Sequence, residues 1–140
     1  MLIRLLYVSR AVGPQTTTVT TSILGTAQAF NRQHGIGGVL CQGQGLYMQV
    51  LEGERRDVNR LYGRILRDPR HADCELLHLE EAADRRFAEW SMAHVVLRDD
   101  DPMVRMHHPE FDPYAASGPF MLRLVDELLA DGHRLQAPAG

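Results

Sequence analysis

A glutamine in the middle of an otherwise apolar strand constrains this chain more than any other feature. Residues 45–53 read Gly-Leu-Tyr-Met-Gln-Val-Leu-Glu-Gly, and successive side chains of a strand point to opposite faces. Tyr47, Gln49 and Leu51 therefore share one face, and neither face is polar enough to lie plainly in water. An unpaired buried amide costs about 1–3 kcal/mol. We therefore expect a polar partner to meet Gln49.

A second strand is predicted at residues 2–9, where apolar residues again dominate. Its period of two places Ile3, Leu5, Tyr7 and Ser9 on one face. A face that ends in a phenol and a hydroxyl is, taken alone, typical of the edge of an ordinary core.

Turn residues and apolar periodicity divide the chain into alternating strands and helices. The order β-α-β-β-α-β-β predicts an α+β fold, a ferredoxin-like sheet with two helices on one face. Two C-terminal helices are expected to cover the other face. The predicted strands are 2–9, 36–42, 46–52, 74–79 and 87–97, and the predicted helices are 19–34, a second ending near 68, a short one after 101, and 120–130.

Length and charge exclude several classes of protein. A chain of 140 residues suits one domain, and a net charge of −3 argues against nucleic acid as a partner. No apolar run approaches the roughly 20 residues of a membrane span. The first residues lack the pattern of a signal peptide, so the cytoplasm is the expected compartment. Cys41 and Cys74 lie in predicted strands as reduced thiols, and no spaced Cys/His set predicts a metal site.

Several unusual side chains are predicted to converge on the helix-covered face of the sheet. Each has an ordinary explanation by itself, as a core aromatic, a surface ion pair or a helix cap. Together, around a slot between two helices and a sheet, they favour a flat ligand with polar edges. The residues are Tyr7, Ser9, Ile23, Asn31, Gln49, Arg64, Ile65, Asp68, Trp90 and Met92.

Five ordered blocks carry a further signal: Arg4 to Ser9, Asn31 with Gly35-Ile36-x-Gly38, Gln49 to Gly53, Arg64 to His71, and Arg86 to Met92. Together they resemble the BLUF family, which are blue-light sensors using flavin. The resemblance runs without a gap from residue 1 to about 97. It implies a flavin-binding photosensor domain at 1–98. Residues 99–140 resemble the extension of short stand-alone members, with two helices, a frayed tail and no enzyme domain.

The resemblance also implies a photoactive pair. Tyr7 would donate an electron to the excited flavin, and Gln49 would lie between that phenol and the N5/C4=O edge of the ring. An amide both donates and accepts hydrogen bonds, so its rearrangement can shift the flavin band to longer wavelength. Ser9, Trp90 and Met92 would surround the glutamine and couple it to the fifth strand, which would signal with the C-terminal helices.

The remaining residues are implied to hold the ring. Asn31 would bind its C4=O/N3–H edge, and Arg64 with Asp68 would lie near the opposite carbonyl. Ile23 and Ile65 would sandwich the ring from the two helices. The resemblance favours FAD, with FMN possible.

Two residues depart from the family pattern: Phe30 stands where relatives carry Asn or His, and Gly37 where they carry threonine. We expect altered flavin affinity and dark recovery with the photochemistry retained. The implied protein is a photoreceptor, not an enzyme, which signals through a homo-oligomer or a separate protein partner, without nucleic acid or membrane. Two alternatives stay open: a light-independent interaction module, and a flavin-dependent enzyme on the same fold, for which Cys41 is a possible redox group.

Overall fold

The computed structural model describes residues 1–16, 29–87, 92–97 and 112–130. Five strands form one sheet in the order β4-β1-β3-β2-β5. β2 pairs in parallel with β5, and the other neighbours pair antiparallel. The elements are β1 (Leu2–Ala11), β2 (Gly37–Gly43), β3 (Leu46–Glu54), α2 (Arg55–Leu66), β4 (His71–Glu81), β5 (Ala93–Val96) and α4 (Gly118–Ala130), and residues 29–34 are also helical.

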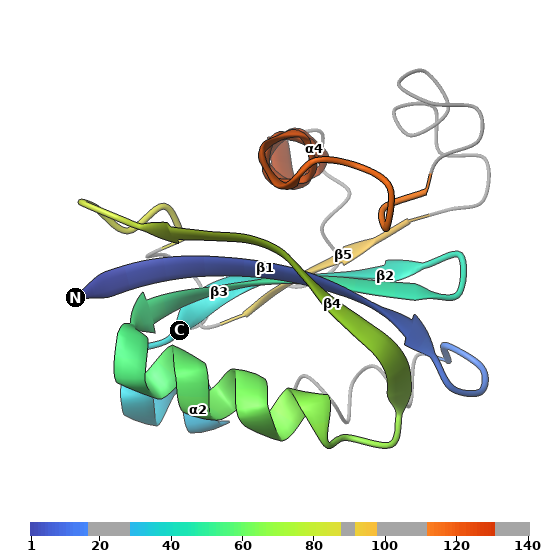
Figure 1. The fold of residues 1–140 in the computed structure, drawn as a ribbon, viewed down its shortest axis with the longest axis horizontal. Coiled ribbons are helices and arrows are strands. Elements are labelled where there is room, and N and C mark those ends of the chain that lie inside the picture. Colours follow the sequence, from blue (N-terminus) through green and yellow to red (C-terminus); the bar gives the residue numbers. More distant parts are fainter. Residues whose placement is uncertain (17–28, 88–91, 98–111, 131–140) are drawn as a thin grey trace.

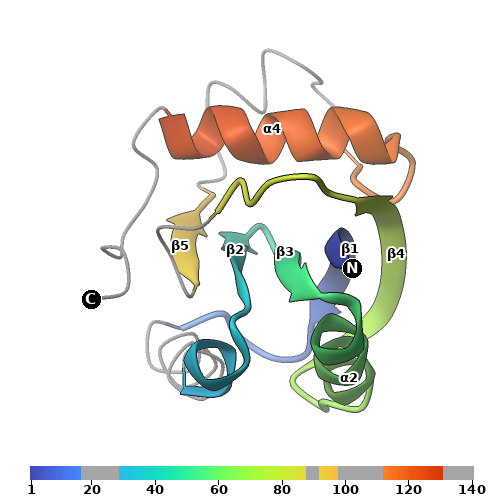
Figure 2. The same ribbon diagram turned by 90° about the vertical axis from the view of Figure 1, so that its left-hand side faces the viewer.

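The sheet is the middle layer of three (Figures 1 and 2). Helix α2 and the helical residues 29–34 lie on one face, and α4 crosses the other. The predicted α+β architecture is therefore confirmed. Each interface has its own apolar core. The core beneath α2 includes Ile3, Leu5, Leu40, Leu51, Val58 and Leu61, and the core beneath α4 includes Leu6, Val8, Met48, Val50, Val125 and Leu128.

The strands that carry the two unusual polar side chains are neighbours in the centre of the sheet. β1 and β3 pair so that Tyr7 lies directly opposite Gln49, which confirms that the two side chains share a face. A tight turn sets the pairing of β2 with β3. Gln44 and Gly45 both have positive φ, 55° and 75°, the conformation that joins antiparallel strands without splaying them.

Most predicted boundaries differ from the structure by a few residues, and three of the differences have a clear physical reason. β4 is longer than 74–79 because it pairs along nearly all of β1. α4 begins before 120, since Ser117 Oγ accepts a hydrogen bond from the Phe120 N–H at 3.2 Å and so caps the helix. The predicted start of the fifth strand at Phe87 is wrong. That residue lies in a bend, where its N–H donates to a Glu52 carboxylate oxygen at 2.9 Å, and β5 begins at Ala93.

Other predictions fall outside the described residues. These are the first part of the helix at 19–34, the stretch 88–91, the short helix after residue 101, and the tail after residue 130. Within the described ranges, none of the helices is long and apolar enough to cross a membrane.

Two helical glycines are expected to respond in opposite directions to an added methyl group. A Cβ on Gly118, at the start of α4, would meet the backbone oxygen of Leu77 at 2.2 Å. Backbone cannot move aside cheaply, so Gly118→Ala should destabilise the protein by about 1–3 kcal/mol. A Cβ on Gly63, inside α2, would meet nothing within 4 Å, and Gly63→Ala should stabilise by about 0.5–1 kcal/mol. Urea unfolding of both variants tests the pair, and equal effects would contradict it.

Candidate functional site

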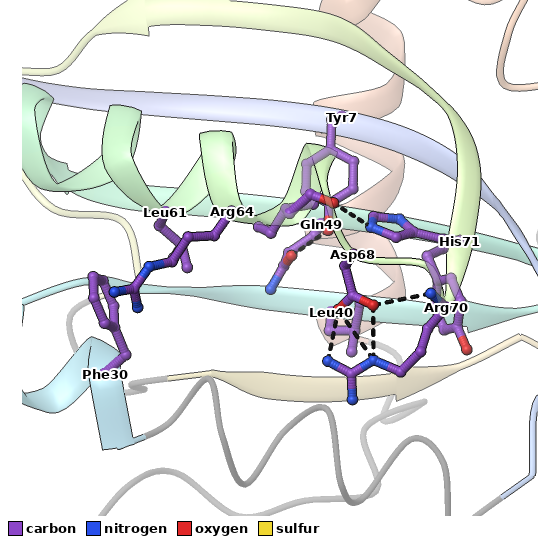
Figure 3. Close-up of a pocket in the computed structure, with 11 residues that line it drawn as sticks. Tyr7, Phe30, Leu40, Gln49, Leu61, Arg64, Asp68, Arg70 and His71 are labelled. Atoms are coloured by element: carbon purple, nitrogen blue, oxygen red, sulfur yellow. Dashed lines mark hydrogen bonds and ion pairs between the residues drawn. The ribbon is translucent and has the colours of Figure 1, made fainter.

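A cavity of about 140 Å³ lies between the sheet and α2 (Figure 3). The sheet contributes polar side chains to it, and α2 contributes apolar ones and an arginine. The segment between α2 and β4 closes one side. The lining residues are Tyr7, Phe30, Leu40, Tyr47, Gln49, Leu61, Arg64, Ile65, Asp68, Arg70 and His71.

A chain of hydrogen bonds crosses the sheet side of this cavity. The Tyr7 hydroxyl donates to Gln49 Oε1 in a short hydrogen bond. The same amide donates through Nε2 to the sulfur of Met92, at 3.3 Å. All three residues are buried. The predicted polar partner of Gln49 is therefore found in Tyr7, and the amide joins strand β1 to the residue that precedes β5.

The phenol of Tyr7 is held in its protonated form. Burial raises its pKa well above the ordinary value, and nearby Cys74, Tyr62 and Asp68 raise it further. At neutral pH the hydroxyl is therefore a hydrogen-bond donor. The ring of Tyr62 packs against it with centroids 5.6 Å apart.

His71 also lines the cavity, and both of its ring nitrogens form hydrogen bonds. Its Nε2 lies 2.6 Å from the carbonyl oxygen of Ile65, and because a carbonyl can only accept, Nε2 carries a proton. Nδ1 lies 2.7 Å from Ser9 Oγ, so in the neutral ring Nδ1 accepts a hydrogen bond from the serine hydroxyl. His71 thereby ties the last turn of α2 to β1 beside the cavity.

Asp68 pairs with Arg70 and not with Arg64. The Arg70 guanidinium donates to Oδ1 at 3.0 Å and to Oδ2 at 2.6 Å, and the backbone N–H of Arg70 donates to Oδ1 at 2.9 Å. These hydrogen bonds lower the pKa of Asp68, so the carboxylate is ionised at neutral pH. The backbone hydrogen bond closes an Asx turn, for which the sequence Asp68-Pro69-Arg70 is a typical signal.

Arg64 is held by an aromatic ring. Its guanidinium carbon lies 4.7 Å from the centre of the Phe30 ring, within the range of a cation–π contact. Phe30 also packs against His34, with ring centroids 4.2 Å apart. Figure 3 shows Phe30 and Arg64 together at the opposite end of the cavity from Arg70.

The structure brings together most of the predicted site residues. Five of them line the cavity: Tyr7, Gln49, Arg64, Ile65 and Asp68. Three lie around it without lining it. Ser9 contacts His71, Met92 contacts Gln49, and Asn31 is buried in the helical residues 29–34.

Two predicted residues, Ile23 and Trp90, lie outside the described ranges. Sequence reasoning gave no role to five lining residues, Leu40, Tyr47, Leu61, Arg70 and His71.

Two other kinds of chemistry, a reactive thiol and a bound metal ion, gain no support at this site. Burial raises the pKa of Cys41 to about 12, so its thiol is protonated at neutral pH and is a poor nucleophile. Its side chain belongs to the core beneath α4, on the opposite face of the sheet from the cavity. In the part of the chain that the structure describes, no group of His, Cys, Asp and Glu could hold a metal ion.

The fold and this cavity define a small α+β domain that holds a cavity with apolar walls and polar edges. Comparison with known protein families gives a match over most of this domain. The family described as sensors of blue-light using FAD matches residues 2–93. The chain therefore belongs to the BLUF family of flavin-binding blue-light sensors.

Individual relatives agree with this assignment. The photoactivated adenylate cyclase subunit beta of Euglena gracilis is 37% identical over 89 residues, which are 63% of this chain and 10% of that protein. The chain thus spans about a tenth of the length of this curated relative. The structure titled "BlsA photo-activated state" is 27% identical, with a TM-score of 0.82 over 100% of this chain and 99% of that one. The BLUF protein BlrB in its dark state gives a TM-score of 0.76 at 28% identity, over 93% and 96%.

Proposed function

We propose that this protein is a blue-light photoreceptor in which Tyr7 and Gln49 form the photoactive pair beside a non-covalently bound flavin. The observation that carries the proposal is the buried hydrogen-bond chain from Tyr7 through Gln49 to Met92. It lies along the cavity, and it contains a phenol that can be oxidised and an amide that can both donate and accept.

The cavity residues fit a flavin ring. Leu40, Leu61 and Ile65 supply apolar walls, and polar groups lie at the edges, as is usual for cofactor sites. We propose that Asn31, Arg64 and Asp68 hold the ring edges, with Ile23 and Ile65 against its faces. Arg70, bound to Asp68, adds a cationic donor at the same edge. FAD is the expected form of the cofactor, with FMN possible.

A bound flavin supplies the absorption of blue light and, once excited, an oxidant. Tyr7 then gives up an electron to it, which makes the phenol strongly acidic, and the proton moves along the existing hydrogen bond to Gln49 Oε1. The amide rotates or tautomerises in response and presents a different set of donors to the ring edge. Return of the electron and the proton would leave the flavin and Tyr7 as they were, with only the hydrogen bonds of Gln49 changed. Because no covalent bond forms, this change would reverse in the dark.

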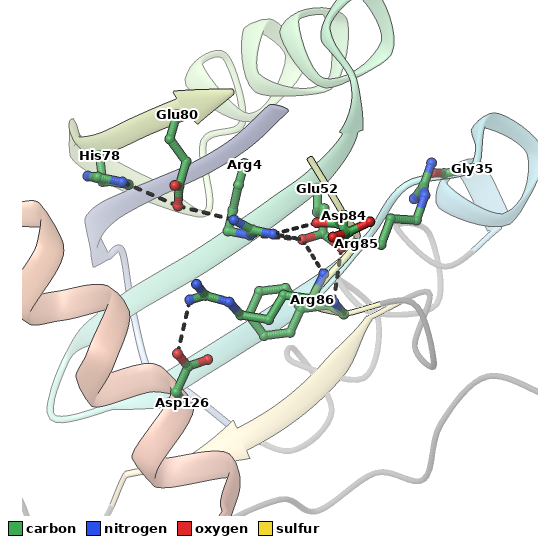
Figure 4. Close-up of polar contacts among 10 residues, drawn as sticks. Arg4, Gly35, Glu52, His78, Glu80, Asp84, Arg85, Arg86 and Asp126 are labelled. Carbon is green, nitrogen blue, oxygen red and sulfur yellow. Dashed lines mark hydrogen bonds and ion pairs between the residues drawn. The ribbon is translucent and has the colours of Figure 1, made fainter. Parts of the chain in front are cut away.

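The signal route that we propose begins at β3, where two side chains form hydrogen bonds with the segment that leads into β5. On the cavity face of β3, Gln49 donates a hydrogen bond to the sulfur of Met92. On the other face, Glu52 accepts hydrogen bonds from the backbone N–H groups of Arg86 and Phe87, both at 2.9 Å (Figure 4). The stretch from Phe87 to Met92 is thus attached to β3 at both of its ends. A rearrangement of Gln49 alters one attachment and leaves the other in place.

Helix α4 is connected to Arg86, the residue just before this stretch. Arg86 forms an ion pair with Asp126 of α4 at 3.0 Å (Figure 4). We propose that a change at Met92 reaches α4 through this contact and through the neighbouring Phe87 and Ala93, which belong to the core beneath α4. The switch is then a hydrogen-bond rearrangement that biases a packed two-state element.

The organisation that we propose is a photosensor at residues 1–98 and a C-terminal extension at 99–140. The protein is proposed not to be an enzyme itself, in contrast to the cyclase relatives that it matches over a tenth of their length. Its output would pass to a second copy of the chain or to a separate cytoplasmic protein.

The absorption spectrum, in the dark and after blue light, tests the proposal. We expect a yellow protein whose flavin band moves to longer wavelength under blue light and returns in the dark, because only a hydrogen bond changes. A flavin that merely bleaches would contradict the mechanism. A protein that binds no flavin would contradict the cofactor and favour a light-independent interaction module.

A further inference from the structure

A groove opens beside the cavity, between α2 and the helical residues 29–34. Its volume is about 450 Å³, and Phe30 and Arg64 line both the groove and the cavity. The groove is therefore continuous with the proposed ring site at the end where these two side chains meet. Its other charged or polar lining residues are His34, Asn59, Arg60 and Arg67.

The groove is strongly cationic. Arg60, Arg64 and Arg67 follow at spacings of four and three residues, so they point from the same side of the helix and its last turn. No carboxylate is among the described residues that line the groove. The guanidinium groups of Arg60 and Arg67 are exposed, and neither forms an ion pair or hydrogen bond with another described residue.

Other arginines of the chain contrast with these. Arg4, Arg70 and Arg86 each pair with a carboxylate. Three neighbouring guanidinium groups without a carboxylate repel one another. Such an arrangement is stabilised by an anion, and guanidinium geometry matches phosphate especially well.

Phe30 gives this groove its connection to the ring site. Its ring stacks beneath the Arg64 guanidinium at 4.7 Å, so one cation stays at the boundary between the two spaces. The residue is one of the departures from the family pattern. An amide or imidazole there could not offer the same apolar platform along the whole guanidinium face.

We propose that this groove binds the phosphate of the flavin side chain and makes the protein selective for flavin nucleotides over riboflavin. The proposal rests on the proposed function, since the ring must occupy the adjoining cavity. A flavin nucleotide carries its phosphate on a flexible chain away from the ring, and riboflavin lacks the phosphate. Arg60 and Arg67 are then specificity-determining residues for the cofactor.

The test compares riboflavin, FMN and FAD binding to flavin-free protein, by quenching of flavin fluorescence at low salt. FMN and FAD should bind at least about tenfold more tightly than riboflavin, because charge-assisted hydrogen bonds to phosphate are strong. Added salt should reduce this ratio, since the arginines are exposed. The double variant Arg60→Gln/Arg67→Gln should bring the ratio close to one and leave riboflavin affinity unchanged.

The double variant Arg55→Gln/Arg56→Gln is the matched control. It also removes two positive charges, from the start of α2, but both residues line a different hollow near the N-terminus, so the ratio should stay as in the unmodified protein. Equal binding of all three flavins, with a normal photocycle, would overturn the groove assignment and leave the photoreceptor intact. An equal loss of selectivity in the control would point to net charge alone and also overturn it. Failure of every flavin to bind would overturn both proposals.

Discussion

Gln49→Leu is expected to bind flavin in the dark and to lose the light-induced red shift completely. Leucine fills a similar volume but can neither accept from Tyr7 nor donate to Met92, so the hydrogen-bond chain is broken at its centre. The buried phenol loses its acceptor, at a cost of about 1–3 kcal/mol. The measurement is the difference spectrum between the illuminated and dark protein, at equal flavin content.

Met92→Leu provides the control for this prediction. It removes the sulfur acceptor and leaves the Tyr7–Gln49 hydrogen bond in place, so the red shift should persist while the dark-recovery rate changes. Circular dichroism of each variant checks that the fold is kept. A full red shift in Gln49→Leu would show that the amide is not the relay, and loss of the shift in Met92→Leu would show that the sulfur contact is part of the chromophore change.

Glu52→Ala is expected to be among the most destabilising single changes in the protein. The carboxylate is fully buried and accepts from Arg4 Nε at 2.8 Å as well as from two backbone N–H groups. Its removal leaves those donors and the buried Arg4 guanidinium without this partner. Breaking a buried ion pair in this way costs about 3–5 kcal/mol. Urea unfolding followed by circular dichroism measures the loss.

Glu54→Ala is the matched control on the same strand. Glu54 is exposed and pairs with the N-terminal amine at 2.9 Å, and exposed ion pairs contribute little to stability. Its unfolding midpoint should stay close to that of the unmodified protein. If the two variants lost the same stability, the effect would belong to charge at that end of β3 and not to the buried network.

The face of the sheet that carries Tyr7 and Gln49 was largely predictable, because local rules determine which side chains of a strand share a face. The period of two assigned the faces within each strand, and the pairing of β1 with β3 brings Tyr7 and Gln49 to the same face of the sheet. The turn at Gln44-Gly45 joins β2 to β3. The same rules missed the partner of Asp68. A spacing of four residues suggested Arg64, whereas the helix ends at Leu66 and the turn that follows brings Arg70 onto the carboxylate.

The burial of Glu52 was harder to foresee. Near the end of a strand, shortly before a second glutamate and two arginines, a carboxylate usually lies in solvent. Its partners come from Arg4 and from the segment after β4, more than thirty residues away in the chain. Only the tertiary structure brings these groups together, and the same long-range contact displaced Phe87 from the predicted fifth strand.

The alternation of Gln49 and Glu52 on opposite faces of β3 has a consequence for folding fidelity. The apolar residues of β3 are similar on its two faces, with Tyr47 and Leu51 on one and Met48 and Val50 on the other. Hydrophobicity alone would tolerate a slip of one residue, which exchanges the faces. The slip would bury a carboxylate beneath α2 and an amide beneath α4, each away from its partners. A slipped sheet would therefore bury two polar side chains without their hydrogen-bond partners. The residues proposed for signalling thus also disfavour misfolded pairings of β3.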